Sequence, residues 1–161
     1  PRGTIRAADK TLPALRFLTE DEAHVLLAVA ARIVPRGEPW PTAEEAGVLE
    51  KVDRELSFMR EDVQDDFRSG LGVLERWLPI ATFRFRAFTA MTPEDQDDYL
   101  RGLETSSLSL LRQLYFGMRT LIAFYYFGDA RAWPPLGYDG PWVGRVEVAP
   151  VEIDFGGGVK G

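Results

Sequence analysis

Hydrophobic residues recur at helical spacing in several stretches of the chain, and polar capping residues precede these stretches. The clearest stretch follows Thr19, because Thr19 and Glu22 have the Thr-x-x-Glu spacing of a capping box. In a capping box the hydroxyl accepts from the third helical amide, while the carboxylate reaches back to the cap amide. This pattern predicts a helix over about 20–34, ended by Pro35-Arg36-Gly37, with an apolar face made of Ala23, Leu26, Leu27, Ala30 and Val34.

Two more helices are predicted before residue 78. Thr42 and Glu45 repeat the capping box, and the helix expected after them carries an apolar stripe of Ala46, Leu49, Val52, Leu56 and Met59. A third helix is expected over about 60–77, with an inward face of Val63, Phe67, Leu71, Leu74 and Leu78. Gly70 and Gly72 weaken its middle, because glycine costs about 1 kcal/mol at a helical site.

The second half of the chain predicts two further helices. Segment 82–88 alternates like a short strand, but no neighbouring segment offers a pairing partner, so a helical turn or packed connection is favoured. Thr92, with Pro93 at the first helical position, starts a helix that carries Tyr99, Leu100 and Leu103. The last helix is expected from about Ser106 to Phe127. These elements predict an all-α fold, a small helical bundle of about five helices.

The composition changes after Phe127. Eight of the fifteen glycines and four of the eleven prolines lie in residues 128–161, which excludes a compact helix there. We therefore expect three parts: an N-terminal arm over 1–17, a helical domain over 18–127, and an irregular, extended C-terminal tail over 128–161. Within that tail, residues 145–151 have the character of a strand that lies along another surface.

The stretch from Leu108 to Phe127 holds thirteen Leu, Ile, Met, Phe and Tyr residues, too many for one helix face. Arg112, Gln113 and Arg119 are costly at bilayer depth, so a buried helix is favoured over a membrane span. Arg112, Phe116 and Arg119 share a narrow stripe. Two interpretations stay open. In the first, the helix is central and its arginines lie at its solvent-exposed edge or pair with the acidic clusters. In the second, the stripe docks on another subunit, because interfaces are enriched in arginine and aromatic residues.

Residues 131–142 form an aromatic loop stiffened by proline. Its large aromatic side chains are costly to leave in water, and rigid side chains lose little entropy on docking. The loop therefore either folds back on its own domain or anchors a partner. The partner interface predicted from both stretches consists of Arg112, Phe116, Arg119, Tyr125, Tyr126, Trp133, Tyr138 and Trp142.

Composition and charge narrow the possible chemistry. A length of 161 residues suits one domain, and a net charge of -6 disfavours nucleic acid or anionic lipid as a partner. The chain has no cysteine, which removes disulfides, thiolate metal sites, thiol catalysis, iron–sulfur ligation and c-type haem attachment.

Residues that could carry chemistry have simpler interpretations. His24 is the single histidine, whereas a bundle di-iron site needs two Glu-x-x-His pairs, so a surface histidine is expected. The glycine run at 156–158 lacks the Lys-Ser/Thr of a phosphate loop. Two acidic clusters stand at helix starts, where the helix dipole favours negative charge; they are Asp62, Asp65 and Asp66, and Asp95, Asp97 and Asp98. We predict no catalytic, cofactor-binding or metal-binding residue.

Three segments, in their order and spacing, carry a resemblance: Leu18 to Pro35, Pro41 to Val48 leading into Val52-Asp53, and Trp133-Pro134 with Leu136 to Trp142. Together they resemble the small-subunit family of gluconate 2-dehydrogenase, an accessory chain of FAD-dependent sugar and alcohol dehydrogenases of the GMC type. The resemblance implies that the FAD and the catalytic base belong to a separate large subunit, whose folding, stability or export this chain supports. Some such complexes add a cytochrome c subunit. The resemblance brings no catalytic residue to this chain.

Family members often carry a twin-arginine export signal, and no such signal is visible after Pro1. We expect a periplasmic protein if a signal was removed before Pro1, and a cytoplasmic one otherwise. Two other functions stay open at this point. One is a free-standing helical domain that binds an apolar ligand in a cleft beside Phe116, Tyr125 and Tyr126. The other is an enzyme that uses lone carboxylates or Tyr138.

Overall fold

The computed structural model describes residues 12–77 and 86–141. In these ranges the chain forms five α-helices and no strand: α1 (Glu20–Ile33), α2 (Val48–Leu56), α3 (Glu61–Gly72), α5 (Pro93–Glu104) and α6 (Ser109–Phe127). Four short helical turns join or extend them: the π-helical η1 (Val73–Trp77) and the 3-10 turns η2 (Phe88–Ala90), η3 (Ala130–Ala132) and η4 (Pro134–Leu136). The predicted all-α bundle of about five helices is confirmed.

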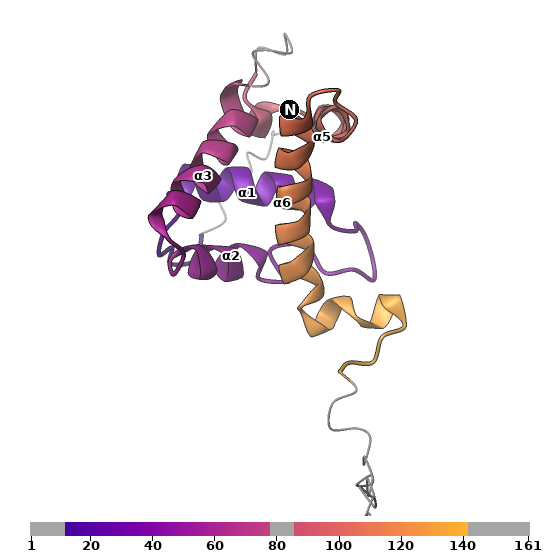
Figure 1. Ribbon diagram of the computed structural model, residues 1–161. Helices are drawn as coiled ribbons and strands as arrows, with labels where there is room; N and C mark the ends of the chain where they lie inside the picture. Colours follow the sequence, from indigo (N-terminus) through magenta and orange to yellow (C-terminus); the bar gives the residue numbers. More distant parts are fainter. Residues whose placement is uncertain (1–11, 78–85, 142–161) are drawn as a thin grey trace, which may run out of the picture.

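Helix α6 is the element around which the others are arranged. In Figure 1 it crosses in front of α1, with α3 on one side and α5 near its first turns, and it contacts α1, α2 and α5. Its buried face consists of Met118, Ile122 and Tyr126, which are spaced four residues apart. The Tyr126 hydroxyl donates a hydrogen bond of 2.8 Å to the Pro41 carbonyl oxygen. One face of α6 therefore lies in the core of the domain.

The capping box predicted at the start of α1 is present. The Glu22 amide donates to the Thr19 hydroxyl at 3.3 Å, and the Thr19 amide donates to the Glu22 carboxylate at 2.8 Å. The helix ends at Ile33 because Val34 is extended and Pro35 follows it. The predicted apolar face is buried except for Leu27, which is half-buried.

The second capping box also forms, but it does not start α2. The Glu45 amide donates to the Thr42 hydroxyl at 3.1 Å, and the turn that follows ends at Gly47, whose φ is +64°. The Val48 amide donates to the Ala43 carbonyl oxygen and the Gly47 amide to that of Glu44, which is the Schellman pattern of a helix end. The box therefore caps a single turn, and α2 begins only at Val48.

Helix α3 starts one residue after the predicted position and continues into η1, but its inward face is shorter than predicted. Leu71 and Leu74 are buried and Phe67 is half-buried, whereas Met59 and Val63 are exposed. The prediction that these last two face inward is wrong, because α2 has already ended at Leu56 and the core lies nearer the second half of α3. Leu78 is outside the described residues.

Gly70 of α3 lies against the Leu114 side chain of α6. A Cβ atom built at Gly70 would lie 3.2 Å from Leu114 Cδ1, which is tighter than ordinary van der Waals contact. The glycine that looked like a weak point of the third helix therefore leaves room for the Leu114 side chain of α6.

The helices predicted in the second half are present. The Thr92 hydroxyl accepts from the Asp95 amide at 3.2 Å, with Pro93 at the first position of α5. The Tyr99 hydroxyl donates to the Leu74 carbonyl oxygen at 3.0 Å and so ties α5 to η1. Phe88, at the end of the alternating segment, is fully buried in η2; residues 82–85 lie outside the described ranges. Helix α6 begins at Ser109 rather than at Ser106.

The segment before α1 is anchored by Asp53 of α2, a contact that the sequence did not predict. The Asp53 carboxylate is 2% exposed and accepts from the backbone amides of Arg16, Phe17 and Leu18 at 2.6, 3.0 and 2.8 Å. Three successive amides aimed at one carboxylate form a backbone anion-binding nest. The described part of the predicted N-terminal arm, from Leu12, thereby packs against the core.

Candidate partner-binding surface

The side of α6 opposite its buried face carries no charged residue. At 100° per residue, an exposed arc of roughly 140° holds only apolar or uncharged side chains. Its members, which we call the α6 arc, are Ser109, Leu110, Gln113, Phe116, Gly117, Thr120, Leu121, Phe124 and Phe127, all exposed except the half-buried Leu121. Leu110 and Phe124 are each 72% exposed, and Phe116 is 46% exposed. Single exposed hydrophobics are common on protein surfaces, but a continuous row is typical of an interaction site.

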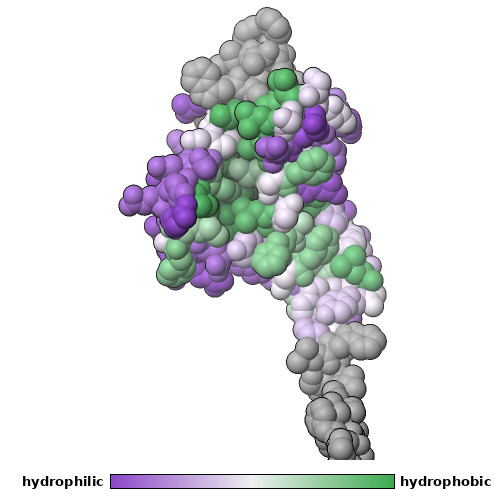
Figure 2. Space-filling model, viewed as in Figure 1, coloured by the Kyte–Doolittle hydropathy of each residue, from purple (hydrophilic) through white to green (hydrophobic). Residues whose placement is uncertain are grey.

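Figure 2 shows where this surface lies on the molecule. Viewed as in Figure 1, hydrophobic patches lie along and beside α6, with paler residues between them, and reach toward the helical turns that follow it; strongly hydrophilic residues flank them. The arc therefore belongs to a larger apolar face of the domain.

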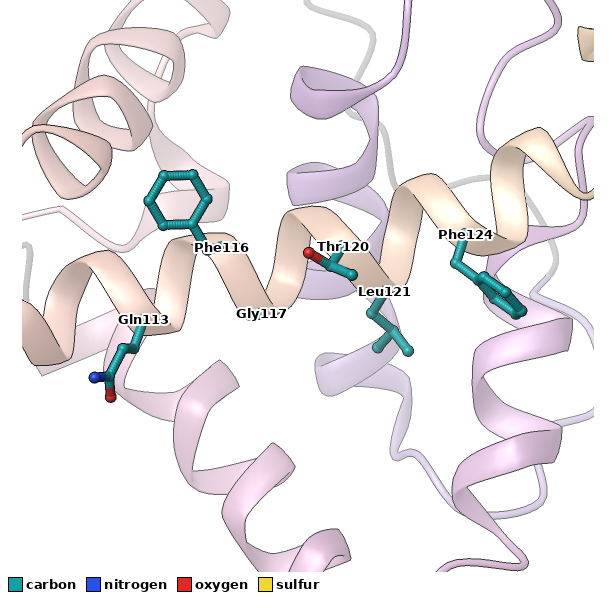
Figure 3. Close-up of a pocket in the computed structure, with 6 residues that line it drawn as sticks. All are labelled: Gln113, Phe116, Gly117, Thr120, Leu121 and Phe124. Atoms are coloured by element: carbon teal, nitrogen blue, oxygen red, sulfur yellow. The ribbon is translucent and has the colours of Figure 1, made fainter.

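An open groove of about 550 Å³ lies in the middle of the α6 arc (Figure 3). Its six lining residues all come from α6: Gln113, Phe116, Gly117, Thr120, Leu121 and Phe124. In Figure 3 Phe116 projects upward from the helix and Phe124 downward; at 100° and 1.5 Å per residue they lie about 80° apart around the axis of α6 and about 12 Å apart along it. A Cβ atom at Gly117 would have no neighbour within 4 Å among the residues that the structure describes. The groove is therefore a gap between two phenyl walls.

The groove has the shape of a docking surface rather than of a ligand pocket. A drug-sized ligand is usually buried over 70–90% of its surface in a cleft with several walls, whereas this groove is lined by one helix and faces solvent. Its polar groups, the Gln113 amide and the Thr120 hydroxyl, are uncharged and can hydrogen-bond to a partner.

Arg112 and Arg119 lie on the flank of α6 beside the arc. Arg112 Nη1 donates to the carbonyl oxygen of Ser106, and Arg119 Nη1 lies 3.4 Å from the Glu104 carboxylate. Both guanidinium groups therefore have partners in the segment that leads into α6, rather than in the acidic clusters. They form the polar edge of the α6 arc.

The two predicted interface tyrosines differ in position. Tyr126 is fully buried, and burial raises the pKa of its phenol; it belongs to the core, so placing it at an interface was wrong. Tyr125 is half-buried, with its ring centroid 5.2 Å from that of Phe124. Because Phe116 lines the groove on another side of the helix, the structure does not bring the three predicted residues together as one cleft.

The aromatic loop folds back on the end of α6 through Trp133. The Trp133 indole Nε1 donates to the Phe127 carbonyl oxygen at 2.7 Å, and its ring packs edge-on against Tyr138 with centroids 5.3 Å apart. Leu136, which is 55% exposed, and Tyr138 stay accessible. The loop is thus partly covered by its own domain and partly exposed, and Trp142 lies outside the described residues.

Lys51 and Asp129 fix the direction in which the chain leaves α6. Lys51 Nζ donates to the Ala46 carbonyl oxygen at 2.8 Å and lies 3.3 Å from the Asp129 carboxylate. Arg131 Nε donates to the same carboxylate at 2.8 Å. The pKa of Asp129 is held well below its usual range, first by the Arg131 side chain and also by Lys51. This network, which the sequence did not predict, positions the turns that carry Trp133.

The other candidates for chemistry lie on the surface. His24 is exposed. In the acidic clusters, Asp97 lies 2.9 Å from Arg36 and Asp98 lies 2.7 Å from Arg101, and Arg60 lowers the pKa of Asp62. Over residues 12–77 and 86–141, no three His, Asp or Glu side chains are grouped so that they could hold a metal ion.

A membrane span was disfavoured from the sequence of the last helix. The helices that the structure describes include none with both the length and the apolar character needed to cross a bilayer.

The interface predicted from the sequence includes Phe116 but not Leu110, Gly117 or Phe124. That prediction rests on the stripe of charged residues on the last helix, whereas the helical period of the uncharged residues locates the arc. The stripe and the arc are neighbours, so the predicted interface lay at the edge of the exposed surface.

Comparison with known proteins identifies a family. The family model for gluconate 2-dehydrogenase subunit 3 matches residues 20–140, which confirms the resemblance found in the capping and aromatic segments. No curated protein matches the chain significantly. The same holds for solved structures.

Proposed function

Because the chain belongs to the gluconate 2-dehydrogenase subunit 3 family, we propose that it is the non-catalytic small subunit of a flavin-dependent sugar or alcohol dehydrogenase of the GMC type. In this proposal a separate large subunit holds the FAD and the catalytic base, and this chain stabilises or chaperones that subunit. A cytochrome c subunit is a further candidate partner, and its haem would be attached outside this chain, which has no cysteine.

The observation that carries the proposal is the exposed, uncharged α6 arc. Leaving Leu110, Phe116 and Phe124 in water forgoes free energy of burial, which reaches about 1.5–3 kcal/mol for a fully exposed large apolar side chain and is smaller for Phe116, which is 46% exposed. A subunit surface recovers that free energy on assembly. Interfaces are also depleted of charge at their centre and enriched in aromatic residues, as the arc is.

The chemistry of the groove supports an accessory role. Gln113 and Thr120 supply an amide and a hydroxyl, which suit hydrogen bonding more than proton transfer near pH 7. The Arg119 guanidinium beside them is paired with Glu104. A docking role therefore uses the groups present more fully than a catalytic role.

Co-expression tests this proposal. The tagged full chain is expressed with the FAD-containing large subunit of a GMC-type dehydrogenase, and the eluate is examined for flavin absorbance and dye-linked oxidation of sugars and alcohols. We expect a yellow, active complex, and a lower soluble yield of the large subunit when the small chain is omitted. A stable, colourless monomer that leaves the flavoprotein in the flow-through would contradict the proposal.

A further inference from the structure

We infer that the Gly117 groove receives one large apolar side chain of the large subunit, inserted between Phe116 and Phe124, with the rest of the α6 arc buried around it. This inference rests on the proposed function and specifies the docking site within it. The partner surface is correspondingly uncharged and apolar at its centre, with hydrogen-bonding groups for Gln113 and Thr120.

Gly117 is what gives the groove its shape. A glycine inside a helix costs about 1 kcal/mol relative to alanine, and Gly70 shows how the fold can use one, since its missing Cβ lets Leu114 approach. Gly117 has no such neighbour among the described residues. The groove over it is open and has the exposed Phe116 and Phe124 in its lining, which is the form of a hole that accepts a knob from outside.

An open glycine is not sufficient to mark a docking site. Gly102 of α5 is equally open, but it lies one turn from Asp98 and next to Arg101, which pair with each other at 2.7 Å on the surface. Gly117 differs because it lines the same groove as the exposed Phe116 and Phe124 and because no charge interrupts the arc. Gly102 is therefore a matched control for substitutions at Gly117.

The dimensions of α6 favour a large partner over a homodimer whose interface consists only of the two α6 helices. Nineteen residues at 1.5 Å each give a face about 28 Å long and about 10 Å wide, or roughly 300 Å² in projection. A stable interface buries about 800 Å² on each side. The partner must therefore reach beyond the helix, and the exposed Leu136 and Tyr138 follow it in the chain.

The first test compares Gly117→Leu with Gly102→Leu in the co-expressed complex. Leucine is a good helix former, and neither site has a described neighbour within 4 Å, so both variants should melt at or above the wild-type temperature by circular dichroism. We expect Gly102→Leu to retain the flavoprotein as the wild type does. Gly117→Leu fills the groove and should weaken retention at least tenfold.

A second pair of variants tests the phenyl wall. Phe124→Ser removes one wall, and Phe58→Ser removes an equally exposed phenyl group, 75% against 72%, just after α2. Flavin retention should fall several-fold in Phe124→Ser and stay near the wild-type value in Phe58→Ser.

The outcomes separate the two proposals. If the wild type retains the flavoprotein and Gly117→Leu retains it equally well, the docking site is wrong and the accessory function stands. If the wild type itself does not retain the flavoprotein, both are overturned. If Gly117→Leu instead converts a wild-type dimer into a monomer and leaves flavin retention unchanged, the groove joins two copies of this chain, and the inference is likewise overturned.

Discussion

Two buried or half-buried carboxylates hold parts of the chain that lie outside the five α-helices. Asp53 gathers three amides of the segment before α1, and Asp129 joins Lys51 to Arg131 at the end of α6. In each case one side chain replaces the hydrogen bonds that a longer helix would have supplied. Single substitutions at these residues should therefore have large effects.

Asp53→Ala should lower the free energy of unfolding by about 3 kcal/mol, because it leaves three amides of a covered segment without an acceptor. Urea denaturation at pH 7 measures the change. Asp66→Ala is the control, since Asp66 is exposed and surface substitutions usually stay within about 0.5 kcal/mol. An Asp53→Ala variant as stable as this control would show that the three hydrogen bonds contribute little.

The lowered pKa of Asp129 predicts the pH dependence of its contribution to stability. A carboxylate whose folded pKa lies below the unfolded value of about 3.9 stabilises the fold above that pH, and the contribution is lost as the pH falls toward the folded pKa. Asp129→Asn should therefore be less stable than the wild type at pH 7, and the difference should shrink below about pH 4. Urea titrations from pH 7 to pH 3 would reveal a constant difference if the expectation is wrong.

At the scale of the helices, the same residue type has opposite roles in two places. Gly47 has φ +64° and closes the turn before α2, whereas a Cβ atom at Gly72, in the last turn of α3, would have no neighbour within 4 Å among the described residues. Glycine is favoured at the first site because L-residues are strained at positive φ. At the second site glycine only weakens the helix.

Alanine substitutions should therefore change stability in opposite directions. Gly47→Ala should lower the free energy of unfolding by about 1–2 kcal/mol, and Gly72→Ala should raise it by up to about 1 kcal/mol. Thermal melts of the two variants beside the wild type measure both changes. Two variants that shift in the same direction would contradict this assignment of the glycines.

The helices were predictable where their signals are local. The Thr19 and Thr92 caps and the proline at the first position of α5 act within one turn, so the sequence shows them directly. The Thr42 box misled because Gly47, five residues on, ends the turn before α2 starts. Asp53 accepts hydrogen bonds from residues 16–18, and Lys51 binds Asp129. These contacts join residues 35 to 78 positions apart, so no local sequence pattern predicts them.

For the candidate surface, the sequence shows that α6 has more apolar residues than one helix face can hold. It does not show which side of α6 stays exposed in the folded domain. The sequence placed Phe116 and Tyr126 in one interface, whereas packing against Pro41 takes Tyr126 into the core and leaves Phe116 outside. Which face a nearly all-apolar helix buries depends on where α1, α2 and α5 lie. Only the tertiary structure supplies that information.

At the scale of the whole molecule, the domain has a core sufficient to fold and a second apolar face that its own helices leave uncovered. Such a surface promotes aggregation in an isolated chain and is stabilising in a complex. The same residues should therefore limit the solubility of the chain alone and support its assembly.

The double variant Leu110→Gln with Phe124→Ser separates these two effects. Both side chains are 72% exposed, so the free energy of unfolding should change by no more than about 0.5 kcal/mol per site. The isolated variant should stay monodisperse by light scattering at concentrations where the wild type aggregates, and it should retain less flavoprotein on co-expression. A variant that gains solubility and still binds the large subunit like the wild type would contradict this expectation. It would show that the exposed apolar face causes aggregation of the isolated chain but does not bind the large subunit.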